Sequence, residues 1–118
     1  MFLDKLSRVS NRIPGTRALC LVDADGIPVE SVAADSSIDL DLLAAELVAR
    51  VRTISDDRAG LAVGEVEQLS VVTDRMTVVV SSVGAGYYLL LVLGPEGSYG
   101  RARYELRRAR LLLQDELV

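Results

Sequence analysis

Two short apolar segments constrain the fold more than any other feature of this sequence. Residues 18–22 and 87–93 hold only apolar side chains and tyrosine, so both faces of either segment would be apolar in a strand. Strands of this kind lie where a sheet is covered on both sides. Both segments are far shorter than the roughly 20 residues of a membrane-spanning helix. We therefore expect strands over 17–22 and 87–93, side by side at the centre of a sheet with helices on both faces.

The remaining periodicity predicts the order of the other elements. Apolar residues at helical spacing predict a first helix over 2–13, a middle helix that Asp39 caps and that ends near Asp56, and a last helix that Ser98 caps. Turn residues separate the other expected strands, 27–33, 64–73 and 76–83. The sequence thus predicts one domain over residues 1–118 with an α+β fold. Its order is helix, hairpin, helix, three-stranded meander and helix, around a single five-stranded antiparallel sheet.

Composition excludes many kinds of chemistry. The 118 residues include no histidine and one cysteine, Cys20, so imidazole catalysis, an intrachain disulfide and thiol-rich metal sites are not expected. The net charge of −4 argues against nucleic-acid binding, and residues 18–49 carry seven acids and no base. We expect a soluble, cytoplasmic protein that is not an enzyme, inserts in no membrane, holds no cofactor or metal and binds a selective protein partner.

Three local motifs have a structural and a functional interpretation. The segment 94–100 resembles a phosphate-binding loop, but it lacks the P-loop lysine and is predicted to connect a strand to a helix. Asp23 to Gly26 is predicted to be a turn and not a calcium loop. The last helix carries arginines and tyrosines that could contact an acidic partner. Solvation of the arginines and packing of the tyrosines against the sheet are the favoured interpretations for the members of this set, Tyr99, Arg101, Arg103, Tyr104, Arg107, Arg108 and Arg110.

The segment 63–73 predicts an edge strand that pairs with a second copy of the chain. It contains no proline, and alternation places Glu65 and Glu67 on the same face as Leu69 and Val71. A strand of this composition exposes backbone groups that another strand can bind. We therefore expect Glu67, Leu69 and Val71 to lie at a dimer interface.

The middle helix has more apolar surface than contact with one sheet requires. At about 100° per residue, one side is predicted to face the core through Leu40, Leu43, Ala44, Leu47, Val51 and Ile54. Leu42, Ala45 and Ala49, flanked by Arg52, lie nearly opposite. We expect these four residues to lie at a dimer interface, packed against the same helix of another protomer; the alternative is that they are good helix formers on an exposed face. A separate polar strip contains Asp39, Glu46, Arg50 and Thr53.

Three sequence motifs together resemble the roadblock / dynein light chain family, in particular its bacterial MglB-like members. They are DGIPVES at 25–31, GEVEQLS at 64–70 and GRARYELRR at 100–108. The resemblance implies a roadblock or profilin-like sandwich and a homodimer in which the middle helix and third strand of each protomer pair. It also implies that the partner is a small Ras-like GTPase of the polarity and motility type.

The resulting hypothesis is a homodimeric regulator or adaptor that binds a small Ras-like GTPase and modulates its hydrolysis or location. We expect Asp39, Glu46, Arg50 and Thr53 to contact the GTPase, with two copies of this chain to one GTPase. No residue is expected to be catalytic. The resemblance implies that any stimulation would come from reshaping the switch loops of the GTPase. The alternatives are a dimeric scaffold that bridges larger proteins and a sensory domain that holds a small molecule.

Overall fold

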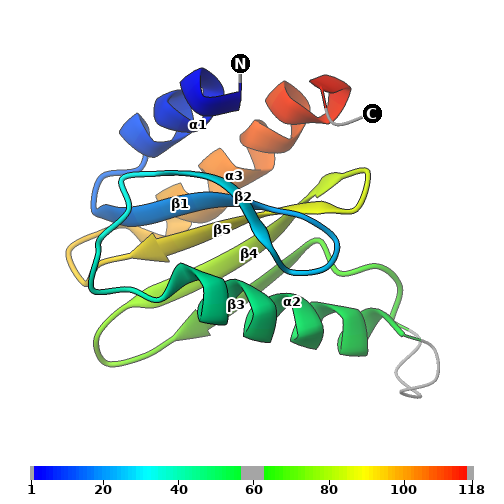
Figure 1. The fold of residues 1–118 in the computed structure, drawn as a ribbon. Helices are drawn as coiled ribbons and strands as arrows, with labels where there is room; N and C mark the ends of the chain where they lie inside the picture. Colours follow the sequence, from blue (N-terminus) through cyan, green and yellow to red (C-terminus); the bar gives the residue numbers. More distant parts are fainter. Residues whose placement is uncertain (1, 57–62, 117–118) are drawn as a thin grey trace.

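The elements follow the predicted order. A computed structural model describes residues 2–56 and 63–116 of the chain (Figure 1). Along the chain the helices and strands are α1 (Phe2–Asn11), β1 (Thr16–Val22), β2 (Pro28–Val32), α2 (Leu40–Ser55), β3 (Gln68–Val72), β4 (Thr77–Gly84), β5 (Tyr87–Leu93) and α3 (Tyr99–Leu113), followed by a 3-10 turn at Gln114–Glu116.

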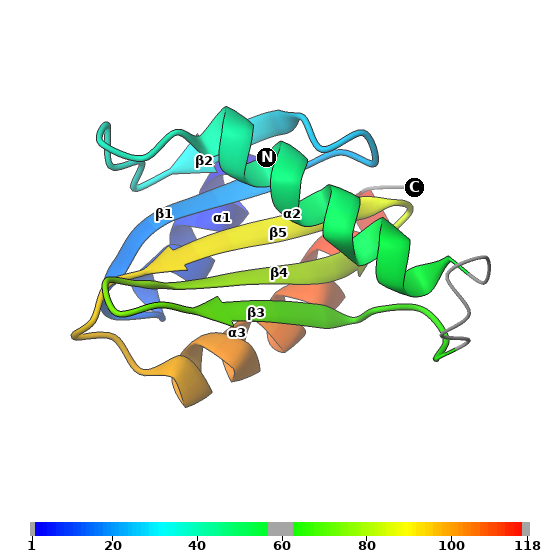
Figure 2. The ribbon, with the colours of Figure 1, turned by 90° about the horizontal axis from the view of Figure 1, so that it is seen from below.

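The strands form one antiparallel sheet with β1 and β5 at its centre. The strand order is β2-β1-β5-β4-β3 (Figure 2). In the central pair, Cys20 lies opposite Leu90 and Leu21 opposite Leu89. The prediction that the two doubly apolar segments are neighbouring central strands is confirmed.

Helices cover both faces of this sheet, so the predicted α+β architecture is confirmed. α1 and α3 lie on one face and α2 lies on the other (Figure 1). Alternate side chains of β1 pack in two separate cores, because successive side chains of a strand point to opposite faces. Leu19 and Leu21 pack in the cluster under α1 and α3. Ala18, Cys20 and Val22 pack in the cluster under α2.

Both predicted helix caps are present. The Asp39 side chain accepts a hydrogen bond from the Leu42 N–H at 3.1 Å. The Ser98 hydroxyl accepts one from the Arg101 N–H at 3.2 Å. These side chains bind N–H groups that the first turn of a helix leaves without a backbone partner.

The third strand is shorter than predicted. β3 begins at Gln68, so residues 64–67 precede the strand. The Val66 N–H donates to the Ser55 hydroxyl at the end of α2 (3.1 Å), and Gly64 has a φ of +94°. A backbone that bonds to a helix end and takes a left-handed turn cannot also continue an extended ladder. Immediately before β3, the Glu67 carbonyl still accepts a hydrogen bond from the Ser82 N–H of β4 at 2.8 Å.

Candidate protein-binding surface on α2 and β3

One side of α2 is buried against the sheet. Ala44, Leu47 and Val51 are buried as predicted, and Leu40, Leu43 and Ile54 are half-buried. Val48 is also buried, although the predicted core-facing side omitted it. Its position one turn after Ala44 was the available signal, since residues four apart lie on the same side of a helix.

The opposite side of α2 is only partly covered by its own chain. Ala45 lies beside the β1–β2 turn, where a Cβ added to Gly26 would sit 3.2 Å from the Ala45 Cα. The Arg52 guanidinium donates to the Ala24 carbonyl of the same turn at 3.2 Å. This close approach to the backbone of α2 accounts for the glycine at position 26, and Ala45 itself is exposed. Leu42 remains 59% exposed, and Ala49 is exposed as well.

β3 forms the outer edge of the sheet next to this helix. Leu69 and Val71 lie opposite Val80 and Val78, which belong to the core under α2, so both point to the α2 side. Leu69 packs against that core, whereas Val71 is 39% exposed. Within residues 2–56 and 63–116, β3 pairs with β4 alone. Its outer backbone groups are thus open to a further strand.

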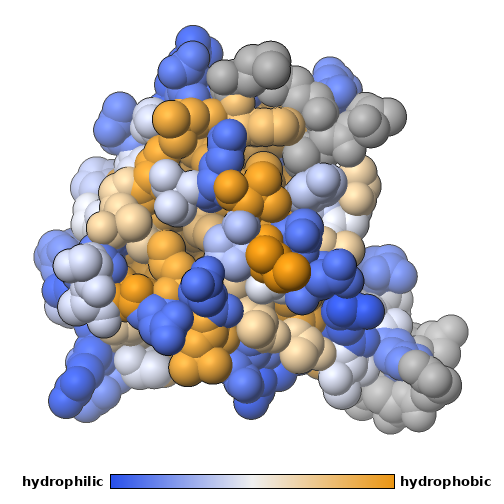
Figure 3. All heavy atoms as spheres, viewed as in Figure 1, coloured by the Kyte–Doolittle hydropathy of each residue, from blue (hydrophilic) through white to orange (hydrophobic). Residues whose placement is uncertain are grey.

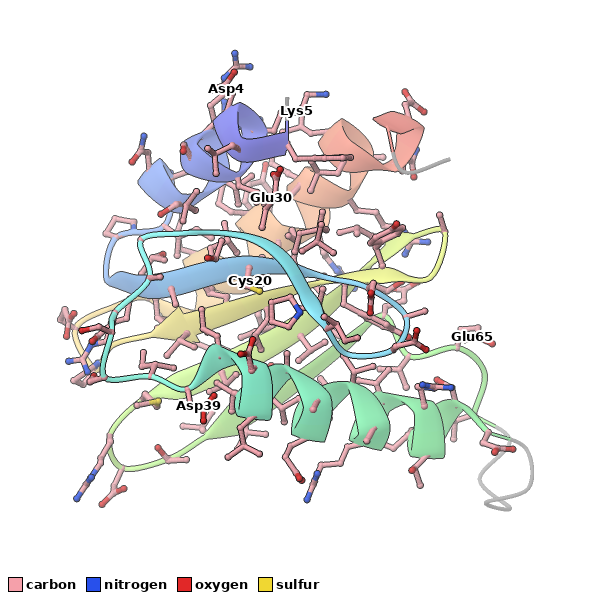
Figure 4. All side chains as sticks on the ribbon, in the orientation of Figure 1. Asp4, Lys5, Cys20, Glu30, Asp39 and Glu65 are labelled. Carbon is pink, nitrogen blue, oxygen red and sulfur yellow. The ribbon has the colours of Figure 1, made fainter. Side chains whose placement is uncertain are left out.

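Residues predicted for the dimer and residues predicted for the GTPase line one hollow of about 330 Å³. Its lining is Ser37, Ile38, Asp39, Leu42, Leu43, Glu46 and Met76. Leu42 was predicted for dimerisation and Asp39 and Glu46 for the GTPase, on separate sides of the helix. They instead share this hollow beside the first half of α2, where Asp39 marks the start of the helix (Figure 4).

The polar strip is held by contacts within α2. The Arg50 guanidinium lies 2.7 Å from the Glu46 carboxylate, and their side chains are 59% and 56% exposed. The Thr53 hydroxyl donates to the Ala49 carbonyl at 3.0 Å. Exposed pairs of this kind contribute only about 0–1 kcal/mol. A partner can therefore replace them at little cost in stability.

The predicted position of Glu67 is wrong. Alternation placed Glu67 on the face of Leu69, but its carboxylate lies 3.8 Å from the Arg107 guanidinium on α3, on the other face of the sheet. The reason is that Glu67 precedes β3, so the alternation of the strand does not govern its side chain. Glu65 lies two residues earlier in the same connecting segment and is exposed (Figure 4).

α3 packs as predicted through its aliphatic residues but not through its tyrosines. Ala102, Leu106, Ala109 and Leu113 are buried. Tyr99 and Tyr104 are instead 37% and 59% exposed. Glu105 is the unexpected buried residue, at 3% exposure, and it lies within 3.7 Å of both Arg101 and Arg108. Its spacing of three from Ala102 and four from Ala109 was the signal that it faces inward.

The local motifs have structural explanations. The Asp23 carboxylate accepts hydrogen bonds from the N–H groups of Asp25 (2.9 Å) and Ile27 (3.0 Å), which confirms the turn. Burial raises the pKa of the Cys20 thiol to about 11, with a smaller contribution from the negative charge of Asp41. Cys20 is therefore a core residue and not an activated nucleophile.

Residues 2–56 and 63–116 contain no group of three or more His, Cys, Asp or Glu side chains that could hold a metal ion. None of their helices is both long and apolar enough to cross a membrane.

The sheet, its two helical layers and the open β3 edge define the class of fold, which is roadblock/MglB-like. A Roadblock/LC7 domain from Streptomyces avermitilis is 23% identical, with a TM-score of 0.83 over 96% of this chain and 94% of that one. MglB of Myxococcus xanthus is 18% identical, with a TM-score of 0.82 over 98% and 95%. MglC of the same organism is 27% identical, with a TM-score of 0.73 over 98% of each chain. No family model and no curated protein matches the sequence.

Proposed function

We propose that this chain is a cytoplasmic, bacterial homodimeric regulator or adaptor of a small Ras-like GTPase, with no catalytic residues of its own. The observation that carries the proposal is the exposure of two apolar side chains, Leu42 on α2 and Val71 on β3, together with an open strand edge. Figure 3 shows apolar atoms exposed among charged ones on the face that includes α2. The likeness to MglB and MglC structures supports the same class of function.

In the proposed dimer, β3 pairs with β3 of a second copy and the two α2 helices pack antiparallel. Strand pairing would satisfy the outer backbone groups of β3 and join the two sheets. Leu42 and Ala49 lie seven residues apart on the same side of α2, so both would face the partner helix. The small Ala49 side chain permits close approach, and Leu42 supplies apolar area.

The GTPase would bind where the two polar strips lie beside each other. Each protomer would contribute Asp39, Glu46, Arg50 and Thr53, of which the last three are exposed along α2. One composite surface made from two protomers accepts one asymmetric partner, so the expected stoichiometry is two chains to one GTPase. The regulator would act on the switch loops of the GTPase, which are the segments that differ between its nucleotide states.

The dimer is tested by placing a charge on the uncovered side of α2. The Leu42→Arg variant should be a monomer, because dimerisation would bury an unpaired charge. Light scattering at micromolar concentration measures the mass. Asn11→Arg is the matched control, since it adds the same charge at an exposed position at the end of α1. A wild-type chain that is monomeric at this concentration would contradict the proposal.

The GTPase surface is tested by exchanging two charges. Glu46→Arg combined with Arg50→Glu keeps an ion pair within the helix but reverses the pattern that a partner meets. Binding of a small GTPase captured from the native cell should weaken and lose salt dependence, while the dimer persists. Arg8→Glu, exposed on α1, is the control. Wild-type affinity in the double variant would show that the GTPase does not use this strip.

The two alternative functions, a scaffold and a sensory domain, lead to different expectations. A scaffold would bind its partners equally well whichever nucleotide the GTPase carries, whereas a regulator distinguishes the GTP-bound from the GDP-bound form. A sensory domain needs a cavity between sheet and helix. The positions of β1 that face α2 are instead occupied by the buried side chains of Ala18, Cys20 and Val22.

A further inference from the structure

The outward side of α3 carries a basic and aromatic surface that the proposed dimer and GTPase contacts do not use. α3 contains five arginines and one glutamate, although the whole chain has a net charge of −4. Six of its exposed residues follow two neighbouring rows at a spacing of four, which places them side by side on the helix. The arginine–tyrosine surface consists of Tyr99, Arg103 and Arg107 in one row and Gly100, Tyr104 and Arg108 in the other.

Ring contacts and a buried carboxylate orient the cations of this surface. The Arg103 guanidinium carbon lies 5.6 Å from the centre of the Tyr99 ring, and that of Arg108 lies 5.8 Å from the Tyr104 ring. Arg108 also donates to the buried Glu105 carboxylate at 3.3 Å. Arginines that are already oriented lose less conformational freedom when they bind a partner.

The two rows border a hollow that has room for a side chain. Gly100, Arg103, Tyr104 and Arg107 line a volume of about 280 Å³. A Cβ added at Gly100 would meet no atom within 4 Å, so this side of the hollow is open. Arg107 makes one long, exposed ion pair with Glu67, at 3.8 Å. In the part of the chain that the structure describes, Arg103 makes no ion pair with a carboxylate.

We propose that the arginine–tyrosine surface binds an acidic segment of another protein. Guanidinium groups bind carboxylates through paired hydrogen bonds, and arginine and tyrosine are enriched among the residues that dominate interface energetics. Arg103 and Arg107 are about 6 Å apart along the helix axis. Carboxylates four residues apart on a helix, or two apart on an extended chain at about 7 Å, match this spacing. The acidic charge of the rest of the chain disfavours nucleic acid.

This surface lies on the opposite face of the sheet from α2 (Figure 1). An acidic segment and a partner bound at α2 would therefore be held at the same time, which suits an adaptor. The test below contains no GTPase, so its result is independent of the proposed GTPase function.

The probe is a labelled alanine-based helical peptide with glutamates four residues apart, and fluorescence anisotropy measures its binding to the full chain. The wild-type chain should bind this peptide but not the same peptide with glutamine, and added salt should weaken binding. Arg103→Glu and Tyr104→Ala should each weaken binding by about tenfold or more. Arg75→Glu, in the exposed turn before β4, changes the charge equally and should bind as wild type. Arg103 is exposed, so an unchanged melting temperature is expected for its variant.

Three results would overturn the proposal. The first is equal peptide binding by the wild-type chain and Arg103→Glu. The second is Arg103-dependent binding of a single-stranded oligonucleotide without binding of the glutamate peptide. The third is salt-dependent self-association in light scattering that Arg103→Glu abolishes, which would make a second copy of this chain the occupant.

Discussion

At the scale of single residues, two buried side chains that can ionise, Glu105 and Cys20, have different environments. Glu105 keeps its carboxylate buried because Arg108 and Arg101 lie 3.3 Å and 3.7 Å away. Burying an unpaired charge would be costly, whereas a paired one is tolerated. Cys20 is accommodated differently, because burial raises the pKa of its thiol and so keeps the group uncharged.

The buried thiol predicts a loss of stability in alkali. Its pKa is raised from 9.0 to about 11 on folding. As the pH rises above 9.0, the unfolded thiol ionises first, so the unfolded state binds fewer protons and the free energy of unfolding falls towards pH 11. A shift of this size corresponds to about 3 kcal/mol at most. Urea unfolding should show a shallower alkaline decline for Cys20→Ala than for wild type, and identical declines would contradict this account.

At the scale of elements, the start of α2 combines a structural and a proposed functional role in one side chain. The Asp39 carboxylate caps the helix through the Leu42 N–H and also lines the hollow beside Glu46. Loss of binding in a variant at this position would therefore be ambiguous unless the two roles are separated.

Two substitutions at Asp39 separate them. Asp39→Ala removes the cap and should lower the free energy of unfolding by about 1 kcal/mol. Asp39→Ser keeps an oxygen that accepts from the backbone but removes the charge, so its stability should stay near wild type. If the charge contacts the GTPase, both variants should bind it more weakly to a similar degree. Urea denaturation and anisotropy measure the two quantities, and a stable Asp39→Ala variant would exclude the capping role.

At the scale of the whole molecule, the sheet separates two surfaces of different character. α2 and the β3 edge present apolar and mixed charge on one face, and α3 presents arginine and tyrosine on the other. Between them, β1 and β5 are paired on both edges and covered on both faces. Local opening should therefore be rare in the central strands β1 and β5 and more frequent in the edge strand β3.

Amide hydrogen exchange should report both the core and the proposed dimer. Exchange should be slowest in β1 and β5, whether the chain is monomeric or dimeric. In the proposed dimer, β3 amides gain partners, so they should exchange faster in Leu42→Arg than in wild type while β1 and β5 stay unchanged. Equal β3 exchange in the two proteins would show that β3 does not lie in an interface.

The sequence by itself determined the order of elements, the two central strands and the helix caps. These depend on local patterns: apolar residues on both faces mark a covered strand, and Asp39 and Ser98 bind the N–H groups of the turn that follows them. The face of α2 that packs on the sheet was also predictable, with the exception of Val48, because helical periodicity repeats over its 16 residues.

Only the tertiary structure decided what depends on contacts between distant segments. The Ser55 hydroxyl accepts a hydrogen bond from the Val66 N–H, and β3 begins only at Gln68. Glu67 therefore precedes the strand, and its side chain contacts Arg107 on the other face of the sheet. Met76 completes a hollow with α2 that brings the predicted dimer and GTPase residues together. Periodicity describes one element at a time, whereas the side on which a connecting residue lies depends on which neighbours satisfy its hydrogen bonds and charge.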